Sequence, residues 1–249
     1  MVELYQIEEY VRRREYTDYI MPVWLPFLPL ILMLVGGLWF AFFAWYSAQP
    51  YYTHYYTYNP FHPVVFETYF FILTLLGVAI NVYVVYKWIW RRNEHFKRQK
   101  LLLNAIKDFL KERGFNVGKL EMICMDVEVE ETERNPILWA LIQFIPYVGG
   151  ILLIYVYHFL NRDFFMHEIR EDAFLEGISR LLSDAGIDFN YIRFSYVRDR
   201  NTILYLILTL ITFGFFVLYW VYTLTKDPNN HFMEHRKWED QLLNALRRI

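Results

Sequence analysis

Residues 71–86 read FILTLLGVAINVYVVY, residues 142–159 read IQFIPYVGGILLIYVYHF, and residues 206–222 read LILTLITFGFFVLYWVY. The three segments resemble one another, and none contains Lys, Arg, Asp or Glu. They lie within longer apolar stretches at 64–90, 136–160 and 202–224, and a fourth apolar stretch occupies 22–48. Each stretch is longer than the roughly 20 residues that a helix needs to cross a ~30 Å hydrocarbon core. The sequence therefore predicts a mainly α-helical integral membrane protein with four apolar segments.

The composition supports a membrane protein. Of the 249 residues, 56% are hydrophobic, 20% are aromatic and 21% are charged, and the charges are concentrated between the apolar stretches. This pattern excludes a soluble enzyme and a disordered chain. The net charge of −2 gives no reason to expect nucleic acid as a partner. The single cysteine, Cys124, excludes an internal disulfide.

The distribution of Lys and Arg predicts the orientation in the membrane. Arg12, Arg13 and Arg14 precede the first apolar stretch, and a cluster of Lys and Arg begins at Arg91, directly after the second. The Tyr-rich connection 49–63 contains neither Lys nor Arg. Because cytoplasmic loops carry the excess of positive charge, we expect a multi-pass protein of the cell membrane with a cytoplasmic N-terminus.

An internal repeat continues beyond the apolar segments. The motifs LLNAI (102–106), FLEGI (174–178) and LLNAL (242–246) follow the apolar segments at matching distances, with His95, His167 and His235 each nine residues before the third motif position. Gly114 and Gly186 follow that position by ten residues in the first two copies. The chain therefore divides into an N-terminal part at 1–63 and repeats at 64–135, 136–200 and 201–249, the last one truncated.

The polar part of each repeat has the pattern of an amphipathic helix. In 167–185, apolar residues recur every three or four positions and charged residues occupy the other face. Gly186 then predicts the end of the helix. We expect three such cytoplasmic helices, together with short strands around 117–129 and 187–197 that pair in a layer against the membrane.

The third and fourth apolar stretches contain helix breakers at mid-depth. Pro146 is followed by Gly149 and Gly150 in one, and Gly214 follows Thr212 in the other. Each half is only about ten residues, or roughly 15 Å of helix. These stretches are interpreted as re-entrant hairpins with both ends in the cytoplasm, which would place the Arg-rich segment 161–200 there. A complete but kinked span is the alternative, because Gly and Pro also occur in spanning helices.

The run from Thr212 to Tyr222, TFGFFVLYWVY, resembles the signature of an uncharacterised prokaryotic (archaeal and bacterial) family of multi-pass membrane proteins. The segments of that family follow the pattern T-x-G-[IF]-[YF]-x-x-Y-W-x-Y, often in tandem. The match is good in the fourth stretch, loose in the third and weak in the second, and it does not cover residues 1–63. The resemblance implies a small multi-pass or hairpin membrane protein and implies no reaction, so no catalytic residue is assigned from it.

The three histidines in matching register are the candidate metal ligands. If the repeats pack around a pseudo-threefold axis, His95, His167 and His235 converge, and three imidazoles can hold Zn²⁺ or Cu²⁺. His231 and His235 also have the i,i+4 spacing of ligands on one helix face. The other interpretation, which the sequence alone favours, is that each histidine contacts headgroups or caps backbone and recurs only because the unit recurs, so that no cofactor is required.

The sequence offers little support for catalysis. It contains no GxSxG, Walker or Rossmann motif, and Asp126, Glu128, Glu130, Glu131 and Glu133 are interpreted as an exposed strand face with divalent-ion binding as the alternative. We therefore expect a non-enzymatic membrane scaffold, or an accessory subunit of a larger membrane assembly, that contacts the lipid bilayer and acts as a homo-oligomer. An oligomeric channel or transporter is the alternative.

Overall fold

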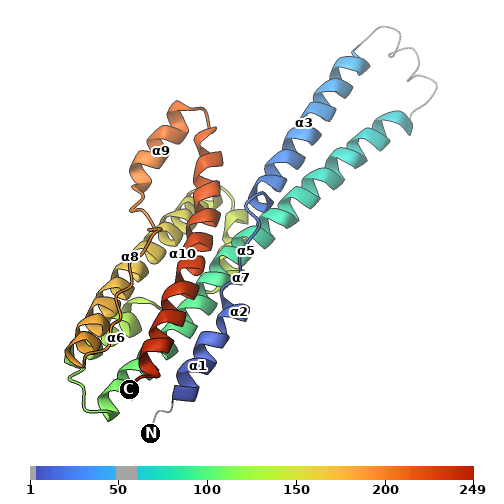
Figure 1. Cartoon of the computed structure of the whole chain (residues 1–249). Helices are drawn as coiled ribbons and strands as arrows, with labels where there is room; N and C mark the ends of the chain where they lie inside the picture. The colour runs from blue at the N-terminus through green and yellow to red at the C-terminus, as the bar shows by residue number, and fades with distance from the viewer. Residues whose placement is uncertain (1–3, 49–60) are drawn as a thin grey trace. The chain divides into compact units, whose positions relative to one another are not determined.

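The computed structural model describes residues 4–48 and 61–249, and the regular structure in these ranges is helical (Figure 1). The chain forms two compact units, one of residues Pro22–Val85 and one of Met1–Met21 together with Tyr86–Ile249. The elements in chain order are α1 (Leu4–Arg12), α2 (Arg14–Thr17), η1 (Leu25–Phe27), α3 (Leu28–Ser47), α5 (Phe61–Glu112), α6 (Gly118–Glu130), α7 (Pro136–Leu141), η2 (Ile142–Phe144), α8 (Gly149–Asp184), α9 (Thr202–Ile211) and α10 (Phe216–Leu246).

The unit of residues Pro22–Val85 consists of α3 and the first part of α5, which pack closely where glycine allows it. A Cβ atom at Gly36 would lie 3.5 Å from the Phe70 ring, and one at Gly77 would lie 3.5 Å from the Pro29 carbonyl oxygen. Large apolar side chains face outward, among them Leu34, Leu38 and Phe71. Two helices, Leu25–Tyr46 and Glu67–Glu112, are long and apolar enough to cross a membrane. The Tyr-rich segment 51–58 lies outside the described residues.

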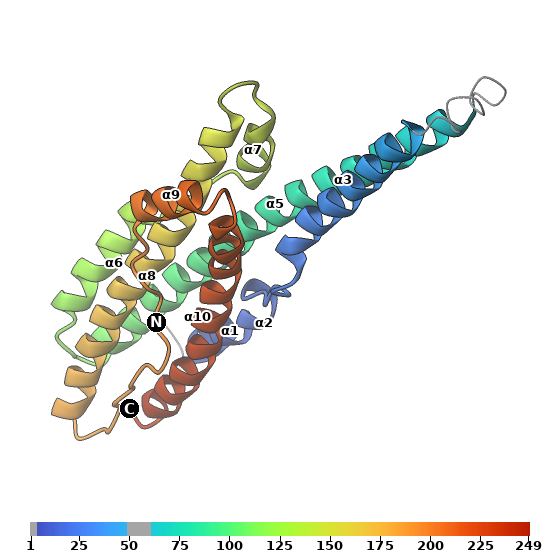
Figure 2. The ribbon, with the colours of Figure 1, turned by 90° about the horizontal axis from the view of Figure 1, so that it is seen from above.

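In the other unit, the polar part of α5 packs against α8 and α10 (Figures 1 and 2). The shared core contains Ile106 and Phe109 of α5, Phe174 of α8 and Trp238 of α10, all fully buried. The amphipathic face expected in 167–185 forms this core, since Phe174, Ile178 and Leu182 are all 0% exposed. α1 and α6 complete the core through Ile7 and Leu120.

The predicted helix ends at glycine are confirmed. Gly114 and Gly186 adopt positive φ angles of 84° and 76°, a region that glycine enters without the Cβ clash of other residues. After α8, the backbone N–H of Ile187 donates to the carbonyl of Leu182 (2.8 Å) and that of Gly186 donates to Ser183 (2.9 Å). This is the Schellman arrangement, which satisfies the last carbonyls of a helix.

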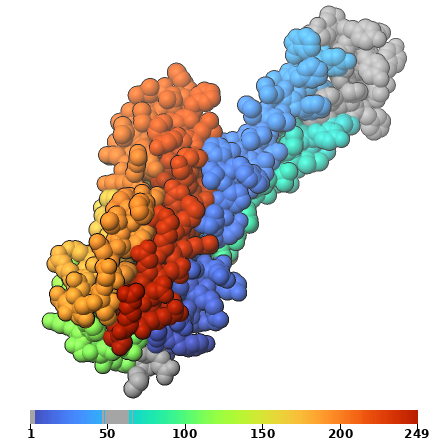
Figure 3. Space-filling view, in the orientation of Figure 1, coloured from blue at the N-terminus to red at the C-terminus, as the bar shows by residue number. Residues whose placement is uncertain are grey.

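The third and fourth apolar stretches are hairpins rather than single helices. In the third, α7 and η2 lead into a turn at 145–148, and the chain returns as α8 (Figure 2). In the fourth, α9 is followed by a turn at 212–215 and returns as α10, and the two helices form one continuous surface in Figure 3. Tyr147 and Phe213 stand at the two turns with positive φ angles of 66° and 51°, and both side chains are almost fully exposed.

An ion pair joins the two ends of each hairpin. Arg134, which precedes α7, donates to Asp163 of α8 (Nε to Oδ2, 2.8 Å). Arg200, which precedes α9, donates to Asp227 of α10 (Nε to Oδ2, 2.7 Å). The two ends of each hairpin therefore lie next to each other.

The expectation of paired strands is wrong. Residues 118–130 form α6, and residues 187–197 are extended without strand pairing within the described residues. Leu120, Cys124 and Val127 recur at helical spacing and are buried, which outweighs the alternation of acidic residues read as a strand. The backbone of the extended segment is held by carboxylates, because the N–H groups of Val197 and Phe194 donate to Glu168 and Glu234.

The turn between α7 and α8 gives a test of the hairpin. A Cβ atom at Gly149 would collide with the backbone carbonyl of Gln143, whereas one at Gly150 meets nothing within 4 Å. We expect Gly149→Ala to lower the free energy of unfolding by about 1–3 kcal/mol, as overpacking does. Gly150→Ala should be neutral or slightly stabilising. Thermal unfolding in detergent measures both, and equal melting temperatures for the two variants would contradict the hairpin geometry.

Candidate metal centre

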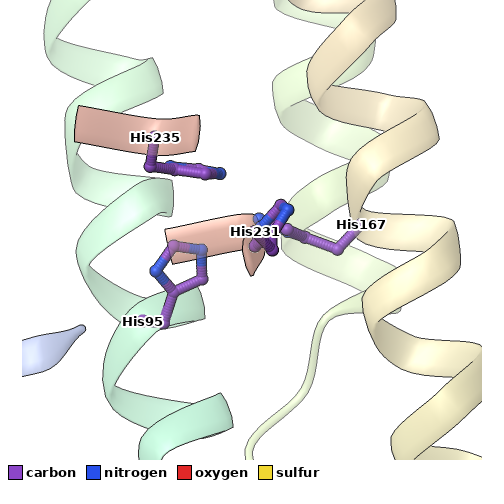
Figure 4. Close-up of side chains that lie close together, drawn as sticks. All are labelled: His95, His167, His231 and His235. Atoms are coloured by element: carbon purple, nitrogen blue, oxygen red, sulfur yellow. The ribbon is translucent and has the colours of Figure 1, made fainter. Parts of the chain in front are cut away.

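Four histidines from three helices meet inside the unit formed by α5, α8 and α10. His95 lies on α5, His167 on α8, and His231 and His235 lie one turn apart on α10 (Figure 4). All four side chains are buried, with at most 2% exposure. One ring nitrogen from each lies within 4.8 Å of those of the other three. This is the spacing expected of groups that surround one small ion.

The structure brings together the three histidines that the repeat aligns. The ring centre of His95 lies 5.2 Å from that of His167 and 4.5 Å from that of His235, and the last two are 6.1 Å apart. His231 joins them at 4.3 Å from His235. The i,i+4 spacing of His231 from His235 was the sequence feature that indicated this fourth histidine.

The Nδ1 atoms of His95, His167 and His231 each contact a carboxylate. The distances are 2.9 Å from His95 to Asp18 Oδ1, from His167 to Glu131 Oε2 and from His231 to Glu168 Oε2. Metal-bound histidines have this arrangement, in which the outer nitrogen donates to a carboxylate and fixes the ring orientation. Each ring therefore directs its Nε2 atom toward the middle of the cluster.

His235 has a different outer partner. Its Nδ1 atom lies 2.7 Å from the side-chain amide of Gln99 and 3.4 Å from Glu239 Oε1. The same amide donates to Glu239 Oε1 at 2.6 Å. The ring is thus oriented by two side chains on the side away from the other histidines.

Three of the four Nε2 atoms have no partner. Those of His95, His167 and His231 are buried and lack one among the residues described, whereas that of His235 lies 2.6 Å from Glu171 Oε1 in an ion pair. Leaving one buried polar group unsatisfied costs roughly 1–3 kcal/mol. Three such atoms in one place, each with its other ring nitrogen anchored by a carboxylate, fit a shared electrophile as their common partner.

A layer of arginines neutralises the carboxylates around the centre. Arg98 pairs with Asp18 (2.8 Å) and Glu239 (2.7 Å), Arg193 pairs with Glu171 (2.7 Å), and Arg170 lies 3.5 Å from Glu131. Asp18 comes from the segment after α2, and Arg193 comes from the extended segment between α8 and α9. Elements outside the three helices therefore support the centre.

Burial and charge set the protonation of the ring nitrogens. Burial, together with the neighbouring His235, holds the pKa of His231 well below its usual range, so this ring is neutral and able to bind a metal. Burial acts against the charged form of His235 as well, but Glu171 and Glu239 outweigh it and raise the pKa of His235 to about 9. Despite its own burial, Glu171 has a pKa well below the usual range because His235 and Arg193 stabilise its charge.

Aromatic side chains close the centre. Phe96 stacks on His167 with ring centres 4.2 Å apart, and Phe232 lies 4.6 Å from His95. Phe164 packs against His231 at 5.8 Å. These rings separate the imidazoles from solvent, which strengthens any electrostatic interaction inside.

The other sequence candidates lie outside the centre, with one exception. Cys124 is on α6 rather than on a strand, and burial raises its thiol pKa to about 11, so it is unreactive. Asp126, Glu128 and Glu130 are exposed, as an acidic surface requires. Glu131 is the exception, since it is 3% exposed and holds His167. In the sequence alone, nothing separates Glu131 from its exposed acidic neighbours.

Residues 200–242 match a family model described as a domain of unknown function, DUF4234. The matched range contains the hairpin of α9 and α10 as well as His231 and His235. It fits the expected resemblance to an uncharacterised family, and it does not test the expected motif. Comparisons with curated proteins and with solved structures found no match.

The arginine layer gives a test of how the centre supports the fold. Replacing Arg98 by Met removes the nearest cation from the buried Asp18 and Glu239, with Arg14 left at 3.6 Å from Glu239, and breaking a buried ion pair in this way costs about 3–5 kcal/mol. The control is Lys111→Met, which removes an exposed pair with Glu121 and should cost less than about 1 kcal/mol. Unfolding in denaturant measures both, and similar losses would show that the buried network contributes no special stability.

Proposed function

We propose that the protein is a membrane-anchored metal-binding protein in which His95, His167, His231 and His235 coordinate one transition-metal ion through Nε2. The observation that carries the proposal is the convergence of four buried imidazoles, three of which present an Nε2 atom without a partner on a ring whose Nδ1 is anchored, while that of His235 contacts Glu171. Imidazole is a suitable ligand for Zn²⁺, Cu²⁺, Fe²⁺ and Ni²⁺. An ion at this place would join α5, α8 and α10.

The surroundings of the centre support a structural rather than a catalytic ion. Catalytic metal sites keep a position open for water or substrate, whereas structural sites are closed by protein ligands. Here four imidazoles come from three helices, and Phe96, Phe164 and Phe232 pack against them. We therefore infer that the protein is not an enzyme and that the ion stabilises one arrangement of the three helices.

We propose a multi-pass arrangement with the N-terminus in the cytoplasm. Two helices have the length and composition of membrane spans, and the positive residues lie before the first and after the second. The hairpins α7–α8 and α9–α10 then enter the cytoplasmic leaflet and return. Their paired ends at Arg134–Asp163 and Arg200–Asp227 support this, as does the length of α9, whose 10 residues extend about 15 Å, half of the hydrocarbon layer.

The apolar hairpin surfaces support a role as a membrane scaffold or as an accessory subunit of a membrane assembly. Leu210, Ile211 and Phe215 near one turn, and Ile145 and Ile151 near the other, are exposed and suit lipid or a second apolar surface. Shallow hairpins of this kind would occupy area in one leaflet only. We propose that the protein acts in this way as a homo-oligomer or within a larger complex, with the metal-joined helices as its rigid cytoplasmic part.

Metal binding by the purified full-length protein in detergent tests the first proposal. We expect one ion per chain by elemental analysis, and removal by chelator should lower the melting temperature. Readdition at 100 times the dissociation constant should restore about 2.7 kcal/mol of stability. His167→Phe keeps a ring beside Phe96 but removes a ligand, so it should weaken binding by more than the roughly 10–100-fold that loss of an outer partner costs.

The matched control is His158→Phe, because His158 bonds Thr202 and stands outside the cluster. This variant should bind metal with the affinity of the natural chain. Equal affinity of both variants, or no bound metal in any preparation, would refute the metal centre. Circular dichroism in the presence of chelator shows whether His167→Phe retains its helices.

Cysteine labelling tests the arrangement in the membrane. In a Cys124→Ser background, Ser183→Cys places a single thiol on an exposed position near the end of α8. In intact right-side-out vesicles we expect an impermeant maleimide to label it only after detergent is added. Thr53→Cys, in the connection that the charge pattern places outside, is the control and should be labelled at once. Labelling of Ser183→Cys in intact vesicles would refute the re-entrant hairpins.

A further inference from the structure

Glu171 lies beside the four histidines, although it is not among the residues whose donor atoms all lie within 4.8 Å of one another. It lies on α8 one turn after His167, is 2% exposed, and its Oε1 atom is 2.6 Å from Nε2 of His235. The two atoms form a close ion pair, and neither has a further partner in the described part of the chain. Glu171 thus contacts His235 on the side that faces the centre.

The second oxygen of Glu171 is anchored in the way that the Nδ1 atoms are. Arg193 Nη2 donates to Oε2 at 2.7 Å, and Arg193 is itself fixed by Asp172, to which its Nε donates at 2.9 Å. Metal-bound carboxylates are in turn held by hydrogen bonds from outside. Glu171 therefore has one oxygen fixed by an outer partner and one that contacts His235 on the inner side, much as His95, His167 and His231 have one nitrogen fixed and one turned inward.

Glu239 shows that proximity to His235 alone does not give this geometry. It occupies the same position in its repeat, four residues after the aligned histidine, as Glu171 does. Glu239 Oε1, however, lies on the Nδ1 side of His235 at 3.4 Å and accepts hydrogen bonds from Arg98 and Gln99. Two buried glutamates therefore contact the two nitrogens of one ring, and Glu171 is the one on the inner side.

We propose that Glu171 is a fifth ligand, so that the centre supplies four imidazole nitrogens and one carboxylate oxygen to the ion. This deepens the proposed metal-binding function and rests on it. Closed zinc sites are almost always four-coordinate and tetrahedral, so five protein donors favour an ion that accepts five or six ligands. Imidazole together with carboxylate selects iron(II) or a similar first-row divalent ion over structural zinc.

Cobalt(II) reports the number of ligands in the full-length protein, because tetrahedral cobalt absorbs visible light far more strongly than five- or six-coordinate cobalt. We expect the natural chain loaded with Co²⁺ to give the weak bands of high coordination. Glu171→Gln should give intense tetrahedral bands and an affinity lower by more than the roughly 10–100-fold that loss of an outer partner costs. Glu176→Gln, an exposed glutamate on the same helix, is the control and should keep the weak bands.

Any other result of the cobalt experiment would contradict one specific part of the proposal. Intense bands from the natural chain, or weak bands unchanged in Glu171→Gln, would overturn Glu171 as a ligand and leave it as an ion-pair partner of His235. If calorimetry detects no Co²⁺ binding to the natural chain, the proposed metal-binding function itself fails. Should Glu171→Gln lose its fold by circular dichroism, Glu171→Asp keeps the charge beside Arg193 but withdraws the inner oxygen, and it must give the intense bands.

Discussion

The requirement that buried polar groups find partners shapes the unit formed by α5, α8 and α10. Four imidazoles at its centre need acceptors for their outer nitrogens, and Asp18, Glu131 and Glu168 supply three of them. Those carboxylates are buried and need cations, which Arg98, Arg170 and Arg193 supply. Asp18 follows α2, and Arg193 belongs to the extended segment 187–197. Because the buried imidazoles and carboxylates need these two residues as partners, both irregular segments are held against the helices.

The same constraint governs the ends of the hairpins. A helix that starts at an apolar surface leaves N–H groups without partners, and Asn135 and Asn201 accept from them as N-caps before α7 and α9. Arg134 and Arg200, one residue earlier, bind Asp163 and Asp227 on the returning helices. Polar groups therefore lie at the base of each hairpin. At the turns, the aromatic side chains of Tyr147 and Phe213 are almost fully exposed.

The sequence predicted the features that depend on spacing along single helices. His95, His167 and His235 each precede Asn104, Glu176 and Asn244 by nine residues, and helices that pack in matching register bring such positions together. The glycine stops and the buried face of α8 follow from the same local rules. Asp18, Glu131 and Arg193 could not be found in this way, because they reach the centre from outside the repeated helices. The prediction of a strand at 117–129 was wrong because it relied on a short alternation of acidic residues. The buried Leu120, Cys124 and Val127 follow the helical period instead.

Burial and position bear on the interpretations that the sequence left for the histidines. Contact with headgroups does not fit side chains that are at most 2% exposed, and helix capping does not fit residues within α5, α8 and α10. If the Nε2 atoms of His95, His167 and His231 had no partner, the cost would be about 3–9 kcal/mol at roughly 1–3 kcal/mol each, comparable with the ~5–15 kcal/mol that stabilises a whole domain. Structural Zn²⁺ contributes about 10–16 kcal/mol in zinc-finger peptides, so the proposed ion would offset a cost of this size. It would also explain why apolar side chains, which would pack there without any partner, do not fill the centre.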